Sequence, residues 1–183
     1  MIWENCFNFR IKRVRKLWLS CYLPYVSVSF ILIPSCFLLI SPHAALYVLI
    51  NRILAEFITN FHSFFVIGPN HSGDDIYRFD YHFADKGEYA VHQVISSCNY
   101  HTGTRTKDYL QMWLNYQIEH HLFPRFPMLK YREVQPKVQA ICEKYNVPYI
   151  QESGHLRFRK LIRICIGKSK MKWLHKDALT LAP

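Results

Sequence analysis

The sequence lacks any CxxC pair and has few acidic residues for its number of basic ones. Its six cysteines are scattered, which argues against a zinc ribbon or disulfide framework and predicts free thiols in a reducing compartment. Asp and Glu total 13 against 23 Lys and Arg, a formal net charge of +10. Such a balance can indicate nucleic-acid binding, but no binding motif accompanies it. The basic residues flank apolar segments, which favours anionic lipid headgroups and predicts no nucleic-acid partner.

Two long apolar segments occupy the first third of the chain. Leu17 to Ile40 contains no charged residue and is long enough to cross the ~30 Å hydrocarbon core of a bilayer. Ala44 to Ile67 is also apolar but contains Arg52 and Glu56, which are four apart and can pair on one helix face. We therefore predict a transmembrane helical hairpin over residues 17–69.

Charge runs predict how the remaining chain is organised. Residues 1–16 end in a basic flank that is expected to be cytosolic, because positive residues favour that side of a membrane. A hairpin then returns residues 70–152 to the cytosol as a helical cap. Residues 153–183 form a basic tail, which suits either a membrane-interface segment or a solvated end. The predicted fold class is an all-α membrane protein, one transmembrane hairpin followed by this cytosolic cap.

Two helices are expected within the cap. The spacing of Val134, Val138 and Cys142 predicts an amphipathic surface helix from about Glu133 to Tyr145, packed over the candidate site. An earlier helix from about Asp108 to Leu122, capped by a preceding threonine, would end before Pro124.

The earlier helix carries the most distinctive side chains in the chain. At roughly 100° per residue, Gln117, His120 and His121 fall within an arc of about 100°. Imidazole nitrogens and an amide oxygen on one face can hold a first-row transition metal, with iron, zinc, copper and nickel all admissible. Three ligands do not complete such a site, and an adjacent His pair can also serve only the helix end.

The residues around this motif resemble a known family. The string Trp113 to Pro127, WLNYQIEHHLFPRFP, resembles the third histidine box of membrane-bound fatty acyl desaturases, particularly the acyl-lipid and front-end type. The segment Asn70 to Phe79 is similar to the stretch that follows the last membrane helix in that family, and the similarity runs from about Arg52 to Glu152.

The resemblance implies a site and a reaction. His120 and His121 match the two histidines of the box, Gln117 matches the glutamine of this subgroup, and His71 matches a further ligand position. These residues would hold non-haem iron in a di-iron centre, with no catalytic residue beyond the ligands. The implied reaction is O2-dependent desaturation of a fatty acyl chain in lipid metabolism, with a membrane lipid or acyl substrate, a cytochrome or ferredoxin as electron donor, and the endoplasmic-reticulum membrane as location.

Two acidic residues after His71 are weaker candidates. Asp74 and Asp75 are close enough in sequence to orient imidazoles as hydrogen-bond acceptors. Alternatively they only form a polar turn with Gly73. His62 lies near the same membrane border and is interpreted as structural.

The chain departs from the family pattern because it contains neither HxxxH nor HxxHH. The ligands present would supply about half of a dinuclear site. We therefore expect a C-terminal portion of a desaturase that is inactive alone. The alternatives are a non-catalytic desaturase-like protein, which could be a partner of a complete desaturase, and a related lipid hydroxylase. A soluble zinc or nucleic-acid binder would require residues 17–40 to be water-soluble.

Overall fold

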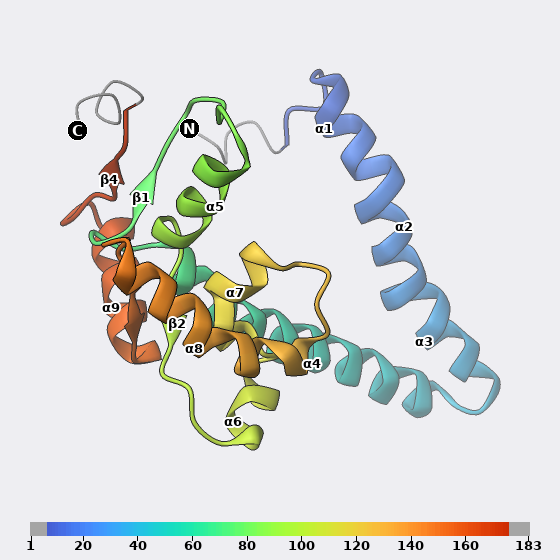
Figure 1. The fold of residues 1–183 in the computed structure, drawn as a ribbon. Coiled ribbons are helices and arrows are strands. Elements are labelled where there is room, and N and C mark those ends of the chain that lie inside the picture. The colour runs from blue at the N-terminus through green and yellow to red at the C-terminus, as the bar shows by residue number, and fades with distance from the viewer. Residues whose placement is uncertain (1–6, 176–183) are drawn as a thin grey trace. The chain divides into compact units, whose positions relative to one another are not determined.

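The structure is a computed structural model that describes residues 7–175, and the chain divides into two units, Met1–Phe61 and His62–Pro183. The first unit consists of helices (Figure 1). A continuous helical segment, Lys12–Leu39, precedes the long helix α4. Its successive turns are α1 (Lys12–Leu17), η2 (Trp18–Tyr22), α2 (Leu23–Val26), η3 (Ser27–Leu32), α3 (Ile33–Cys36) and η4 (Phe37–Leu39). Helix α4 spans Pro42–Ile67.

Two prolines explain the uneven turns of the first helical segment. A proline removes one backbone N–H and its ring crowds the carbonyl four residues earlier, which widens that turn. The π-helical turns η2 and η3 lie just before Pro24 and Pro34. Both prolines occupy the first turn of the α-helical stretch that follows, and the wider turn before each one accommodates the missing N–H and the ring. The helix therefore continues through both positions.

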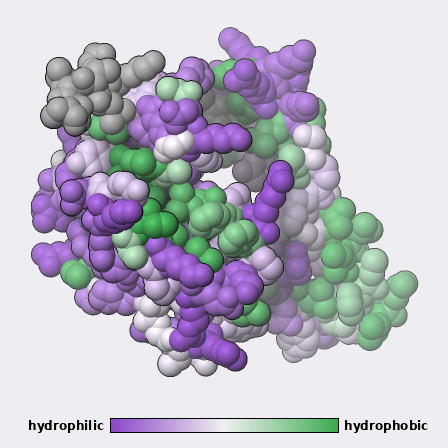
Figure 2. Space-filling model, viewed as in Figure 1, coloured by the Kyte–Doolittle hydropathy of each residue, from purple (hydrophilic) through white to green (hydrophobic). Residues whose placement is uncertain are grey.

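The first unit exposes its apolar side chains. Leu39 is 93% exposed and Ile40 is 74% exposed. Figure 2 shows hydrophobic residues gathered over the end of this unit where the two helical segments meet. Both Lys12–Leu39 and Pro42–His71 are long and apolar enough to cross a membrane. An apolar surface of this kind is unfavourable in water and suits lipid, which is compatible with the predicted membrane protein.

The predicted ion pair within α4 is confirmed. Arg52 Nη2 lies 3.2 Å from Glu56 Oε1. The Tyr25 hydroxyl donates to the same carboxylate from the first helical segment. Glu56 therefore has polar partners along an otherwise apolar stretch, which lowers the cost of its burial in lipid.

The second unit contains shorter helices around the end of α4. In order these are η5 (Gly68–His71), β1 (Tyr77–Arg78), α5 (Lys86–Ile95), β2 (Asn99–Tyr100), α6 (Arg105–Leu110), η6 (Leu114–Tyr116), α7 (Gln117–Leu122), α8 (Met128–Lys144), β3 (Gln151–Glu152), α9 (Gly154–Cys165) and β4 (Lys172–Trp173). Helix α7 packs against α5 and α8, and α9 packs against η5 (Figure 1). The strands form two parallel pairs, β1 with β4 and β2 with β3.

The core of this unit lies between α5, α7 and α8. Val94, Ile118, Val138 and Cys142 are buried together. Ile118 is turned about 100° from Gln117 around the helix, so α7 places Ile118 in this core while Gln117 faces a different direction.

Two predictions about residues 70–152 need correction or refinement. The single helix predicted from Asp108 to Leu122 is wrong, because the chain breaks into α6, η6 and α7, and Met112 and Trp113 adopt positive φ angles of 53° and 56°. The reason is Asp108, which is buried and accepts hydrogen bonds from Asn115 and Tyr116 that draw the chain back on itself.

The amphipathic helix predicted from about Glu133 exists as α8 but begins at Met128. The fold is predominantly helical, as predicted, with the two strand pairs as small additions. The Thr104 side chain accepts from the Lys107 amide and caps α6. The described cysteines are free thiols, and Cys6 lies outside the described residues.

Candidate metal centre

Three predicted ligands from two separated segments meet at one point. Gln117 and His121 are one turn apart on α7, and His71 is the last residue of η5. Gln117 Nε2 lies 3.1 Å from His71 Nε2 and 3.0 Å from His121 Nε2. The two imidazole Nε2 atoms are 3.5 Å apart. We call His71, Gln117 and His121 the donor face.

The amide of Gln117 bears on what the donor face can hold. The side chain is 3% exposed, and its Oε1 atom is buried without a hydrogen-bond partner. Which end of an amide faces a neighbour is assigned from hydrogen bonding, and the two ends are nearly isosteric. Turning the amide by 180° places the carbonyl oxygen between the two imidazoles. That arrangement offers one oxygen and two nitrogens to a cation.

The separations within the donor face fit a single metal ion. Donors bonded at about 2.1 Å to one ion lie about 3.0–3.4 Å apart at octahedral to tetrahedral angles. The observed separations of 3.0, 3.1 and 3.5 Å fall close to this range. Among residues 7–175, no cluster of three or more His, Cys, Asp or Glu side chains is placed to hold a metal ion. The donor face therefore depends on an amide as its third ligand.

His120 takes a different position from the other three predicted ligands. Its ring centroid is 5.7 Å from that of His121, and its Nδ1 lies 3.2 Å from the Tyr131 hydroxyl. That hydroxyl donates its one hydrogen to the Phe123 carbonyl. His120 Nδ1 must then carry the donating hydrogen, which leaves its Nε2 with a free lone pair. His120 is thus held beside the donor face in a tautomer able to bind a metal.

The environment keeps His121 neutral. Burial, with the nearby His71 and His120 rings, lowers the pKa of His121 to about 4. At neutral pH its ring is therefore unprotonated, which is the form that binds a metal.

The opposite side of α7 is held by a buried hydrogen-bond network. Glu119 is fully buried and accepts hydrogen bonds from the Asn99 amide at 2.7 Å and the Tyr149 hydroxyl at 2.8 Å. The Asn99 carbonyl oxygen accepts from the Ile118 backbone amide at 2.9 Å. Burial raises the pKa of Glu119, although its hydrogen bonds oppose that change. We call Asn99, Glu119 and Tyr149 the supporting network, because it ties α7 to β2 and to the segment before β3.

The turn that carries His71 is fixed by its neighbours. The Asn70 side-chain amide donates to the carbonyls of Val66 and Leu114, and its own backbone carbonyl accepts from the Cys98 amide. These contacts link η5 to η6, the short helix immediately before α7. They explain how residues separated by more than forty positions along the chain meet.

The hydrogen-bond partners of Asp75 are two basic residues of α9. Its carboxylate accepts from Arg157 at 2.7 Å and from Lys160 at 2.8 Å, both on α9. Burial alone would raise the pKa of Asp75, but these cations hold it below its usual value. Asp74 is partly buried in the same turn. An acceptor role toward the imidazoles stays a prediction for both residues.

The other histidines have separate contacts. His62 Nε2 donates to the Leu110 carbonyl at 2.7 Å. His92 is buried, donates from Nδ1 to the Glu88 carbonyl and accepts at Nε2 from the Tyr81 hydroxyl. Both rings are therefore engaged in hydrogen bonds between or within elements.

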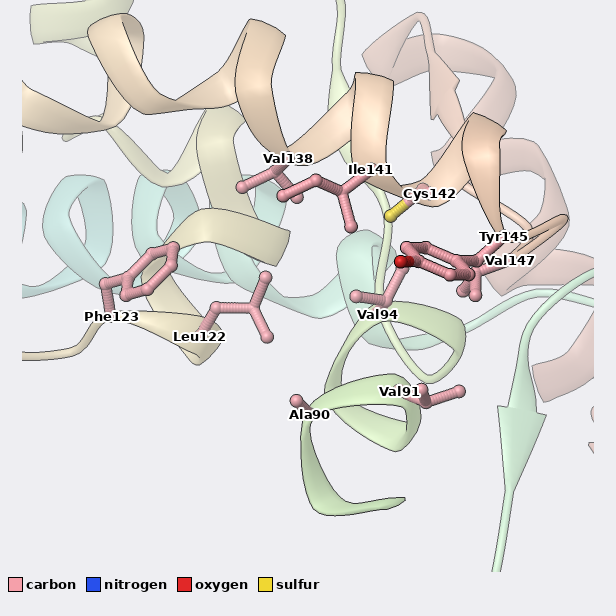
Figure 3. Close-up of a pocket in the computed structure, with 10 residues that line it drawn as sticks. All are labelled: Ala90, Val91, Val94, Leu122, Phe123, Val138, Ile141, Cys142, Tyr145 and Val147. Carbon is pink, nitrogen blue, oxygen red and sulfur yellow. The ribbon is translucent and has the colours of Figure 1, made fainter. Parts of the chain in front are cut away.

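An apolar cavity of about 240 Å³ borders the last turn of α7. Figure 3 shows side chains of α8 above it, side chains of α5 below it, and Leu122 and Phe123 at one side. Its lining is Ala90, Val91, Val94, Leu122, Phe123, Val138, Ile141, Cys142, Tyr145 and Val147. The residue directly after His121 thus contributes to an apolar wall.

Several supporting residues escaped the sequence-based reasoning. Glu119, Asn99, Tyr149 and Tyr131 hold the ligand-bearing helix, and Arg157 holds the His71 turn. Glu119 lies inside the motif, and its position facing away from Gln117 on a helix was a usable signal. No signal in the sequence pointed to Arg157, because it is one of several basic residues in a stretch whose composition is typical of a surface tail.

Comparison with known proteins gives the class. The family profile described as "Fatty acid desaturase" matches residues 6–153. This match covers most of the chain and includes all four predicted ligands. The chain therefore belongs to the fatty acid desaturase family.

Individual relatives are similar over shorter stretches. Fatty acid desaturase 3 of Bos taurus is 40% identical over 87 residues, which are 48% of this chain and 19% of that protein. An acyl-lipid (8-3)-desaturase of Thraustochytrium sp is 36% identical over 63 residues, 32% of this chain and 14% of that protein. A NADPH-dependent stearoyl-CoA 9-desaturase of Mycobacterium tuberculosis (strain ATCC 25618 / H37Rv) is 31% identical over 78 residues, 43% of this chain and 18% of that protein. The aligned segments thus span less than a fifth of each relative. No solved structure matches the chain.

Proposed function

We propose that this chain contributes a non-haem iron site to O2-dependent desaturation of a fatty acyl chain in a membrane. The observation that carries the proposal is the convergence of His71, Gln117 and His121 within 3.5 Å of one another. Family membership supports the reaction class. The names of the relatives support acyl-lipid or acyl-CoA substrates.

Iron is favoured over the other admissible metals by the reaction. An unactivated acyl C–H bond is beyond any side-chain acid or base, so bound iron would supply the oxidising chemistry with O2. The protein's own residues would hold the metal and orient its ligands. His71 and His121 present neutral nitrogens, and Gln117 presents an amide oxygen. Tyr131 fixes the tautomer of His120, and the supporting network fixes the rotation of α7 about its axis.

The apolar wall beside α7 supports an apolar substrate. Leu122 follows His121 directly and lines the 240 Å³ cavity with other apolar residues. An alkyl chain is the ligand chemistry that such a wall tolerates without unpaired polar groups.

The membrane setting is part of the proposal. The two apolar helical segments would form a transmembrane hairpin that leaves the donor face on the cytosolic side, in the endoplasmic reticulum. There a cytochrome or ferredoxin could deliver electrons. The free described cysteines are in keeping with that side.

A second candidate is a non-catalytic desaturase-like protein that pairs with a complete desaturase. The observation that favours it is the size of the ligand set: three converging donors and an adjacent His120 are fewer than a dinuclear site needs. We propose that these 183 residues alone do not desaturate an acyl chain. A related lipid hydroxylase would use the same ligands, so only the product separates these two activities.

Iron content tests the metal site. The full chain would be purified in detergent, loaded with Fe(II) without oxygen, and analysed for iron per chain by mass spectrometry. His121→Ala should lose most of the iron, whereas His101→Ala, at an exposed histidine outside the donor face, should keep it. Equal iron in both variants would reject the site.

Product analysis tests the activity. Fatty acids from membranes that contain this chain would be examined by gas chromatography with mass spectrometry. We expect neither a new double bond nor a new hydroxyl group. A new double bond that disappears in His121→Ala would show that the chain is active alone, and a new hydroxyl group would identify a hydroxylase.

A further inference from the structure

We propose that Arg157, on the C-terminal helix α9, is the positioning residue for His71. This inference rests on the proposed metal site, since it concerns how one of its ligands is held. Arg157 is fully buried, although it lies in a stretch whose composition is that of a surface tail.

The guanidinium of Arg157 donates hydrogen bonds to the backbone on both sides of His71. Its Nη2 donates to the Ser72 carbonyl at 2.9 Å, and its Nε donates to the Pro69 carbonyl at 3.4 Å. These two carbonyls flank residues 70 and 71. A planar fork that binds two carbonyls of one turn fixes the direction of that turn, which a point charge cannot do.

Acidic residues hold the guanidinium in place. Arg157 Nη1 donates to both carboxylate oxygens of Asp75 at 2.7 Å and lies 3.4 Å from Glu152. Lys160 bridges the same two carboxylates at 2.8 and 2.7 Å. Two cations and two anions therefore balance in charge. A buried charge with this many partners is fixed in position, and its loss leaves the others unpaired.

The backbone at Gly73 lies so close to Arg157 and Asp75 that a side chain there would displace them. A Cβ atom at this position would lie 2.4 Å from Arg157 Nη2 and 2.4 Å from Asp75 Oδ1. The backbone thus approaches the guanidinium as closely as a residue without a side chain permits. Aromatic packing adds a further contact, since the Phe158 ring centroid lies 4.5 Å from that of Phe65, in the last turns of α4.

This arrangement gives α9 a role in the site that it does not touch directly. His71 approaches Gln117 and His121 from a short turn, and short turns are held by tertiary contacts more than by their own hydrogen bonds. Arg157 and Asn70 supply those contacts from two sides. Removing the hydrogen bonds of Arg157 should let the His71 imidazole move away from α7 while the fold persists.

The test compares three variants of the full chain in detergent. Arg157→Lys keeps the charge but loses the fork to two carbonyls. Gly73→Ala keeps every charge but pushes the guanidinium away. Arg159→Lys is the matched control, because Arg159 is exposed on the same helix. Circular dichroism shows which variants fold, and Gly73→Ala keeps the test decisive if Arg157→Lys unfolds.

Two readouts separate positioning from stability. The first is Co²⁺ affinity, measured by the visible absorption of the bound metal well below the unfolding temperature. The second is hydrogen exchange of peptides covering the His71 turn and the Cys98 amide, which donates to the Asn70 carbonyl. We expect about tenfold weaker Co²⁺ binding in Arg157→Lys and Gly73→Ala, with faster exchange at those amides. Arg159→Lys should match the wild type in both.

The outcomes distinguish this proposal from the metal site itself. Wild-type Co²⁺ affinity in Arg157→Lys and Gly73→Ala, with lower affinity in His71→Ala, would overturn the positioning role and leave the site intact. If His71→Ala and His121→Ala bind Co²⁺ like the wild type, the metal site fails. The exchange data then decide alone, and unchanged exchange in the His71 turn would overturn the role of Arg157.

Discussion

The two sides of helix α7 differ in how their polar groups are satisfied. On the supporting network, both carboxylate oxygens of Glu119 are hydrogen-bonded and both ends of the Asn99 amide have partners. On the donor face, the Gln117 amide nitrogen is hydrogen-bonded to His71 and His121, but its carbonyl oxygen is buried without a partner. A buried polar atom without a partner usually costs about 1–3 kcal/mol. One side of the helix therefore has its polar groups satisfied, whereas the other leaves one buried oxygen free for the proposed metal.

The largest expected effect breaks the supporting network. Glu119→Leu should lower the free energy of unfolding by about 3 kcal/mol, because the Asn99 amide and the Tyr149 hydroxyl both lose a buried acceptor. Thermal or chemical unfolding of the detergent-solubilised chain measures this. Glu143→Leu, at an exposed position of α8, is the control and should change little. A loss no greater than in the control would show that the network is not stabilising.

The matching change on the donor face should lower metal affinity and leave the unfolding free energy nearly unchanged. Gln117→Leu removes the unpartnered oxygen together with the two hydrogen bonds of the amide nitrogen. Because the gain and the loss oppose each other, the unfolding free energy should change by less than about 1 kcal/mol. Metal affinity should fall at least about tenfold, because a ligand is lost. Gln117→His restores a donor and should bind the metal better than Gln117→Leu. If Gln117→Leu destabilises the chain as much as Glu119→Leu does, the two sides of α7 are not distinct.

Acid should weaken the ion pairs that Asp75 forms with Arg157 and Lys160. Its pKa is lowered in the folded chain from the ordinary value of 3.8, so its ion pairs add stability that is fully present above that value. This stability is lost as the pH falls below 3.8 through the folded pKa. Asp75→Asn should therefore be less stable than the wild type at pH 6 and lose less further stability on acidification. Parallel acid-unfolding curves for the two chains would contradict the lowered pKa.

The smallest expected effect concerns His120. Tyr131→Phe removes the hydroxyl that accepts from His120 Nδ1 and donates to the Phe123 carbonyl. We expect a loss of about 1 kcal/mol in unfolding free energy and a metal affinity lower than that of the wild type but higher than that of Gln117→Leu. Nitrogen NMR of the His120 ring would show whether its tautomer becomes mixed. An unchanged tautomer would mean that the ring is held by other contacts.

Local spacing was enough to predict that two of the candidate ligands lie side by side. Gln117 and His121 are one helical turn apart, and six residues of helix are sufficient to align them even though the longer helix is absent. His120, which the predicted arc also included, lies beside this pair against Tyr131. The break between α6 and α7 was not predictable from spacing, because it depends on Asp108 receiving Asn115 and Tyr116 in a buried site. The sequence pattern around a charged residue near a helix start does not show whether that residue is buried or exposed. Similarly, the resemblance paired His71 with α7, but spacing alone could not.

The sequence by itself determined the two apolar helical segments, the Arg52–Glu56 pair and the alignment of Gln117 with His121 on α7, because each depends on residues that are near neighbours along the chain. Only the tertiary structure decided that His71 meets Gln117, that Glu119 faces a closed network and that Arg157 is buried beneath the His71 turn. The physical reason is that burial and hydrogen-bond partners depend on which distant segments come together. A basic residue in a polar stretch therefore looks alike in sequence whether it meets solvent or a buried carboxylate.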